Sequence, residues 1–211
     1  MNGIRQALEA VLADLDRDDA AAAFRAITSA QPGGLGQAPA EDVRRAPSVG
    51  LREAMALAAE RDSIARQYVT GFEDLFEIAL PQLPPGEVTA AGVQRVFLAL
   101  LARLPDSHIV RKHGEAVAQT VMSAAQRWQE QAAAGTVLDE SPAFLTWDDE
   151  LKAAAINPGT TADLTVAALL LAIVSVTLWP MRPEIARHHP PQRSGGVQAA
   201  ITPDQRARDT K

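Results

Sequence analysis

Residues 164–179 read LTVAALLLAIVSVTLW, sixteen positions without one charged side chain. Because sixteen residues fall short of the roughly 20 that an α-helix needs to cross a bilayer, we expect no membrane span here. A helix that is apolar on all sides is typical of the centre of a bundle, where other helices surround it. The stretch therefore predicts an all-α fold, a multi-helix bundle around a central apolar helix at about residues 164–179.

The composition of the 211-residue chain agrees with a packed helical domain. Hydrophobic residues make up 47% of it and aromatic residues only 4%, which suits helices packed on helices around one core. It contains no cysteine, which excludes disulfides and thiol nucleophiles and fits a cytoplasmic protein. A net charge of −6 argues against nucleic-acid binding, since such proteins usually carry a basic face. We expect one domain at residues 1–182 and a disordered tail at 183–211.

The segment before the apolar helix, residues 153–165, reads AAAINPGTTADLT. An Asn-Pro-Gly turn leads into a helix start that Thr160 or Thr161 can cap, with Asp163 placed to reach back to the cap. The free N–H groups of such a helix start lie at its positive dipole end, where a phosphate oxygen can bind. From these residues alone two interpretations stay open, a well-made helix start and a ligand site.

A single long helix is expected from Leu51 to Leu80, because its apolar residues recur on one stripe. Asp62 lies on that stripe, seven residues from both Met55 and Val69, so its carboxylate should face the core. An ionised acid in a core is costly unless it is paired, hydrogen-bonded or bound to a metal. Asp62 is therefore either a structural acid that pairs with an arginine or caps a neighbouring helix, or a functional acid or Mg²⁺ ligand.

Further helices are expected at residues 2–16, 18–29 and 89–104 and after residue 114. The stretch QPGGLG at residues 31–36 interrupts them, because proline lacks an N–H group and the glycines permit left-handed conformations. This break is either a linker or a phosphate-binding loop.

A second break, PDSHIVRKHG at residues 105–114, concentrates two cations and two imidazoles. Arg111 offers a planar fork and Lys112 a point charge, a pairing that suits polyphosphate oxygens. The alternative is a solvated basic turn. His108 and His113 can ligate a metal or move protons, but no third ligand is evident, which argues against a zinc site.

Five motifs follow one another along the chain: PGGLG at 32–36, LREAM at 51–55, RDSIARQY at 61–68, PDSHIVRKHG at 105–114 and NPGTTADL at 157–164. Each is weak alone, but five in this order are fairly specific. With them the chain resembles the triphosphoribosyl-dephospho-coenzyme A synthase family. The branch it looks closest to is the one linked to tetrahydromethanopterin-dependent one-carbon metabolism.

The resemblance implies an all-helical transferase that uses ATP as a ribosyl donor. In the family reaction the bond between adenine and ribose C1′ breaks, and the 2′-hydroxyl of 3′-dephospho-coenzyme A takes the triphosphoribosyl group. Such a step needs a stabilised oxocarbenium-like transition state and a base near the incoming hydroxyl. Mg²⁺ is the implied cofactor, because it neutralises the triphosphate.

The resemblance also implies roles for individual residues. Asp62 and Asp163 would ligate Mg²⁺ or deprotonate the acceptor, and are the implied catalytic residues. Arg111 and Lys112 would hold the triphosphate, and the first turn of the helix after the Asn-Pro-Gly turn would meet its other oxygens. The full set of implied substrate-binding residues is Arg61, Gln67, Tyr68, Asp106, His108, Arg111, Lys112, Asn157, Gly159, Thr160 and Thr161.

Relatives in this family also carry a Pro-Lys-Pro-Gly stretch and an Asn-Thr-His/Asn-x-Gly stretch, and neither occurs in this chain. Because a bundle without that part would expose apolar faces, we expect a partner chain or a second copy to supply it. Three functions stay open: the transferase acting on ATP and a dephospho-coenzyme A-like acceptor, a non-catalytic or partner subunit, and a related ribosyl transfer in pterin-cofactor metabolism. None of them calls for nucleic acid or a membrane.

Overall fold

The computed structural model describes residues 2–30, 40–84 and 88–177, and these residues form helices and no strand. The expected all-α fold is confirmed. The α-helices are α1 (Asn2–Asp14), α2 (Arg17–Ala30), α3 (Leu51–Ala56), α4 (Ser63–Thr70), α5 (Ala90–Leu101), α6 (Ser107–His113), α7 (Glu115–Ala133), α8 (Pro142–Ala153) and α9 (Gly159–Thr177). A π-helix, η1 (Leu75–Ala79), and two 3-10 helices, η2 (Leu80–Gln82) and η3 (Leu138–Glu140), join them.

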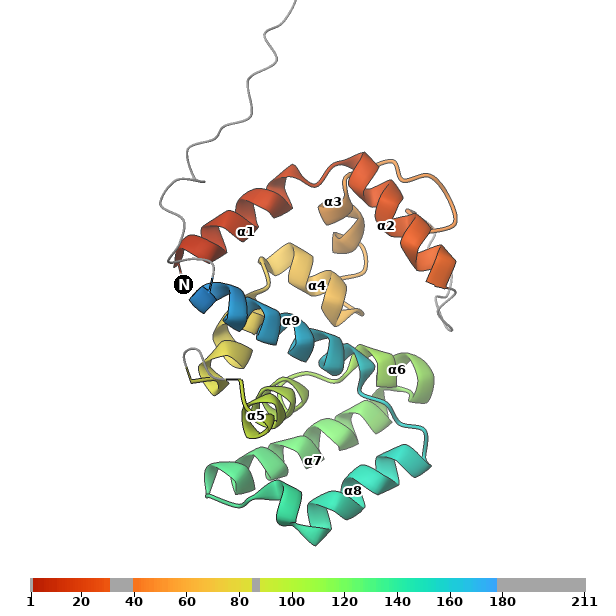
Figure 1. Cartoon of the computed structure of the whole chain (residues 1–211). Helices are drawn as coiled ribbons and strands as arrows, with labels where there is room; N and C mark the ends of the chain where they lie inside the picture. Colours follow the sequence, from red (N-terminus) through yellow and green to blue (C-terminus); the bar gives the residue numbers. More distant parts are fainter. Residues whose placement is uncertain (1, 31–39, 85–87, 178–211) are drawn as a thin grey trace, which may run out of the picture. The chain divides into compact units, whose positions relative to one another are not determined.

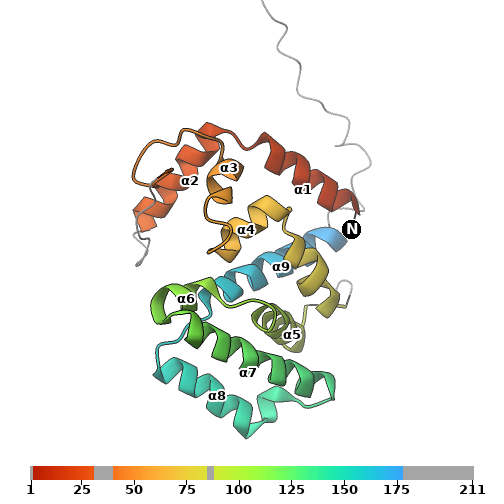
Figure 2. The same cartoon turned by 180° about the vertical axis from the view of Figure 1, so that it is seen from behind.

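Helix α9 lies between α4 and α5, as Figures 1 and 2 show from opposite sides. On one side, Leu164 and Ala168 are buried in a cluster with residues of α5 and η1. On the other, Val166, Leu170 and Ile173 keep 66, 61 and 51% of their surface exposed. The prediction of a helix surrounded on all sides is therefore wrong for this face, within the described part of the chain. All-round apolarity indicates that a helix avoids water, but not which neighbours cover it.

A second cluster lies between α5, α6 and α7 and holds Leu98, Leu101, Ile109 and Val121. The hairpin of α7 and α8 closes it at one end of the described unit (Figure 1). The rings of Trp128, Phe144 and Trp147 meet there with centroids 5.4 to 6.1 Å apart. The cluster of Leu98, Leu101, Ile109 and Val121 holds α7 against α5 and α6, and it thereby positions the start of α6.

The single helix expected from Leu51 to Leu80 is wrong, because the chain breaks twice there. Asp62 is the N-cap of α4, so its half-buried carboxylate binds N–H groups at the start of that helix instead of facing the core. Gly71 (φ +66°) ends α4 in a left-handed conformation, and Phe72 follows at φ +59°. These local signals outweigh the apolar stripe, since a capping side chain and a left-handed glycine satisfy helix ends directly.

The helices expected near the N-terminus and at residues 89–104 are confirmed as α1, α2 and α5. Thr89 caps α5 and accepts the N–H of Gly92 at 3.0 Å. The glycine-rich break at 31–36 and the expected tail at 183–211 lie outside the described residues. No described helix has both the length and the apolar character that a membrane span requires.

Candidate active site

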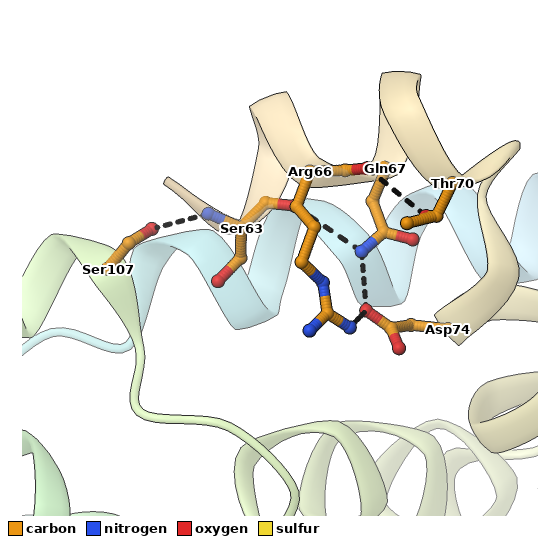
Figure 3. Close-up of polar contacts among 6 residues, drawn as sticks. All are labelled: Ser63, Arg66, Gln67, Thr70, Asp74 and Ser107. Carbon is orange, nitrogen blue, oxygen red and sulfur yellow. Dashed lines mark hydrogen bonds and ion pairs between the residues drawn. The ribbon is translucent and has the colours of Figure 1, made fainter. Parts of the chain in front are cut away.

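The starts of α4, α6 and α9 meet at one point, the three-helix junction of Ser63, Ser107 and Thr160. The Ser107 hydroxyl lies 3.4 Å from the backbone N of Ser63, which donates to it. The same hydroxyl lies 2.9 Å from Oγ1 of Thr160. Figure 3 shows Ser107 reaching the start of α4. Three of the five motifs, far apart in sequence, are thus brought together.

Asp106 holds this junction together with a single carboxylate that is 2% exposed. Its Oδ1 accepts the N–H groups of His108 and Ile109 at 2.8 and 3.1 Å, which caps α6. Its Oδ2 accepts the N–H and the hydroxyl of Thr161 at 2.7 and 2.8 Å. The prediction that Thr160 or Thr161 caps α9 is therefore wrong: α9 begins before both, and its cap comes from Asp106, the residue just before α6.

The expected phosphate site at the start of α9 is partly taken by the protein itself. The Thr161 N–H is bound to Asp106, and the Gly159 N–H donates to the carbonyl of Asn157 at 2.8 Å. The Thr160 hydroxyl is shared with Ser107. Fewer N–H and hydroxyl groups at the start of α9 are left for a ligand than the sequence suggested. The nearby cations must therefore neutralise more of the charge of a bound anion.

Those cations lie in the last turn of α6, where Arg111 and Lys112 are exposed. Burial lowers the pKa of His108, and the charges of Lys112 and Arg111 lower it further. The carboxylates of Asp106 and Asp163 oppose this shift. The same imidazole therefore feels both cations and both acids, so Arg111, Lys112 and Asp163 belong to one electrostatic neighbourhood.

The ring of His108 packs against the start of α9, where a Cβ on Gly159 would lie 3.4 Å from it. Its Nδ1 lies 3.2 Å from Nη2 of Arg111, which can only donate. A neutral ring that accepts at Nδ1 carries its proton on Nε2. This Nε2 is buried and has no partner among the described residues, so His108 offers an unused hydrogen-bond donor.

His108 should make stability depend on pH. Its folded-state pKa is lowered, so below about pH 6.5 the unfolded chain takes up the proton first and unfolding is favoured. The contribution of the neutral His108 ring to stability is therefore complete above that pH and is lost as the pH falls. We expect the free energy of unfolding, measured by denaturant titration, to fall more between pH 7.5 and pH 5.5 in the wild type than in His108→Asn. Equal losses in the two proteins would contradict it.

Two residues expected to bind substrate make their observed contacts outside the junction. Arg61 is exposed, and its Nη1 donates to the carbonyl of Leu57 at 3.0 Å. Tyr68 packs its ring on Phe72, with centroids 5.5 Å apart. No hydrogen bond in the described part of the chain joins either residue to the junction.

The sequence analysis missed Asp74, which is 6% exposed and precedes η1. Its Oδ2 pairs with Nη2 of Arg66 and accepts Nε2 of Gln67 at 2.6 Å, as Figure 3 shows. Gln67 is itself fully buried, so its amide holds Asp74 and does not face solvent. The available signal was Gly71, because a glycine that ends a helix shifts the phase of the residues after it.

A cavity of about 10 Å³ lies beside the junction. Its polar lining comes from Ser63, Asp74, Asp106, Thr160 and Thr161, and its apolar lining includes Ile78, Leu100 and Leu164. That volume holds about one water molecule or one hydroxyl group.

No group of three or more His, Asp or Glu side chains in the described residues is arranged to hold a metal ion. Mg²⁺ that rides on a polyphosphate needs only one or two protein carboxylates. Asp62 uses Oδ1 alone for capping, and Asp163 is exposed with no hydrogen-bond partner among the described residues. Each of these two carboxylates therefore keeps an oxygen without a protein partner in the described part of the chain, as a ligand of a nucleotide-bound magnesium ion requires.

Comparison with protein-family models identifies the family of this chain. The family model CitG, described as ATP:dephospho-CoA triphosphoribosyl transferase, matches residues 2–180 and so includes every element of the junction. No curated protein matches the chain, and no solved structure does.

Proposed function

Because the chain belongs to the ATP:dephospho-CoA triphosphoribosyl transferase family, we propose that it moves the triphosphoribosyl group of ATP to the 2′-hydroxyl of a 3′-dephospho-coenzyme A-like acceptor and releases adenine. The observation that carries the proposal is the meeting of α4, α6 and α9 within the matched residues, with two cations of α6 beside His108, whose ring packs against the start of α9. That arrangement suits a polyphosphate bound across the junction.

In this proposal Arg111 and Lys112 bind the triphosphate. Both are exposed at the C-terminal end of α6 and are free to reach a ligand, apart from the contact of Arg111 with His108. Asp62 and Asp163 hold Mg²⁺, which neutralises charge on the triphosphate when it is bound. Without the metal, these carboxylates would repel the phosphates.

His108 is the proposed donor to the nucleotide, because its neutral ring keeps a buried N–H that no described residue binds. A donor beside a departing base or a phosphate oxygen stabilises the charge that develops there. Its place against Gly159 fixes the ring at the start of α9. The acceptor's identity, the one-carbon-metabolism branch and a partner or second copy stay predictions.

Adenine release tests this function directly. The purified chain is incubated with ATP, Mg²⁺ and either 3′-dephospho-coenzyme A or a reduced pterin, and adenine is measured by chromatography. The proposal predicts adenine only when ATP, Mg²⁺ and the dephospho-coenzyme A are all present. Release of phosphate or diphosphate without adenine would reject ribosyl transfer, and release with the pterin alone would favour the related pterin pathway.

A further inference from the structure

The backbone around Asp74 is unusual on both sides. Phe72, a bulky residue, adopts φ +59°, and η1, a π-helix, follows at Leu75–Ala79. A left-handed conformation in such a residue costs energy and persists only where the surrounding structure imposes it. Single-turn π-helices likewise recur at functional sites. Between these two features the carboxylate of Asp74 binds α4 and lines the cavity.

The carboxylate is held from one side only. Arg66 and Gln67 both bind Oδ2, while Oδ1 accepts no hydrogen bond from any described residue. Figure 3 shows both side chains descending from α4 onto the same oxygen. Since Asp74 lines the cavity, Oδ1 is the oxygen left to meet whatever enters it.

This network is costly for a purely structural element. Nε of Arg66 and Oε1 of Gln67 are buried without a partner in the described part of the chain. Unpaired buried polar atoms are destabilising, and an apolar set of the same shape would avoid that cost. Arg66 and Gln67 are therefore explained better by the need to fix Asp74 in one orientation.

The cavity that Asp74 lines has the size of one hydroxyl group. Ser63 lines it, and its own hydroxyl has no hydrogen-bond partner among the described residues. Thr160 and Thr161 line it from α9, next to the proposed triphosphate site. A hydroxyl placed here would lie between a positioned carboxylate and the start of α9.

We infer that Asp74 is a catalytic residue of the proposed transfer and binds the reacting hydroxyl of the nucleotide acceptor; this rests on the proposed function. As that oxygen bonds to ribose C1′, the bond from C1′ to adenine breaks and the hydroxyl proton passes to Oδ1 of Asp74. The departing adenine takes the electron pair of the broken bond and gains a proton from solvent. Asp74 returns to its carboxylate form by releasing its proton to solvent.

Asp74→Asn should lower the rate of adenine release at least about 100-fold, the usual contribution of a positioned base. Glu77→Gln is the matched control, because Glu77 is a carboxylate in η1 whose side chain is 59% exposed and paired with Arg5 at the surface. It should keep wild-type activity. Ser63→Val, which fills the cavity and leaves the Asp74 pairs in place, should cause a loss similar to that of Asp74→Asn.

Binding separates this inference from the proposed function. Calorimetry with 3′-dephospho-coenzyme A and its 2′-deoxy counterpart should show about 10-fold weaker binding of the deoxy compound to the wild type. Asp74→Asn should bind the two alike, and if it does not fold, Ser63→Val should do so. Wild-type discrimination in a folded variant, or undiminished turnover, would overturn the role of Asp74 alone. A wild type that neither binds the acceptor nor releases adenine would overturn the proposed function and this role with it.

Discussion

Replacing Asp106 by alanine is expected to lower the free energy of unfolding by about 3 to 5 kcal/mol. The carboxylate is 2% exposed and accepts four hydrogen bonds, two from the α6 start and two from Thr161. Its removal leaves all four donors without an acceptor in a site with little room for water. The melting temperature should fall by about 10 °C, which calorimetry and denaturant titration would measure.

Asp62→Ala is the matched control for that result. Asp62 is also an N-cap, but it is half-buried and accepts only the N–H groups of Ile64 and Ala65, at 2.9 and 3.1 Å. An ordinary cap of this kind contributes about 1 kcal/mol. If both variants lost the same small amount, Asp106 would not join α6 to α9 as the contacts indicate.

The second large effect is expected for the double variant Arg111→Ala/Lys112→Ala, which should lower adenine release about 1,000-fold or more. Each side chain is proposed to meet the triphosphate, and loss of a single electrostatic donor in an active site typically costs about 100- to 1,000-fold. Both residues are exposed, so the fold should keep its melting temperature. Activity and thermal unfolding would be measured on the same preparation.

Arg127→Ala is the control for a general effect of charge. Arg127 is an exposed cation on α7 with no hydrogen bond to the junction in the described residues. It should leave adenine release unchanged. A similar loss in this control would show that net charge, and not a site on α6, governs activity. A double variant with full activity would show that the triphosphate does not bind at α6.

The sequence predicted the helical class and most helix positions because apolar periodicity is a local property. It also identified segments that come together, since Ser63, Ser107 and Thr160 lie in three of the quoted motifs. The details of the junction were not predictable in this way. The N-cap of α9 comes from Asp106, 55 positions earlier in the chain, and no spacing rule relates residues on different helices.

Asp74 shows the other limit of sequence patterns. On one continuous helix Asp74 would have been one of several acids, and the apolar pattern predicted that Asp62 faces inward. The left-handed Gly71 and Phe72 reset the helical phase, which turned Asp74 inward, whereas the separate break between α3 and α4 left Asp62 as a cap. The exposed face of α9 is similar, because hydrophobicity does not say what covers a helix.

The central claim is that a nucleotide binds where α4, α6 and α9 meet. Amide hydrogen exchange of the whole chain, read by mass spectrometry with and without ATP and Mg²⁺, tests it without relying on turnover. The account predicts slower exchange in the presence of nucleotide at residues 107–113 and 159–165, and unchanged exchange in α8. Protection confined to other segments, or none at saturating nucleotide, would contradict it.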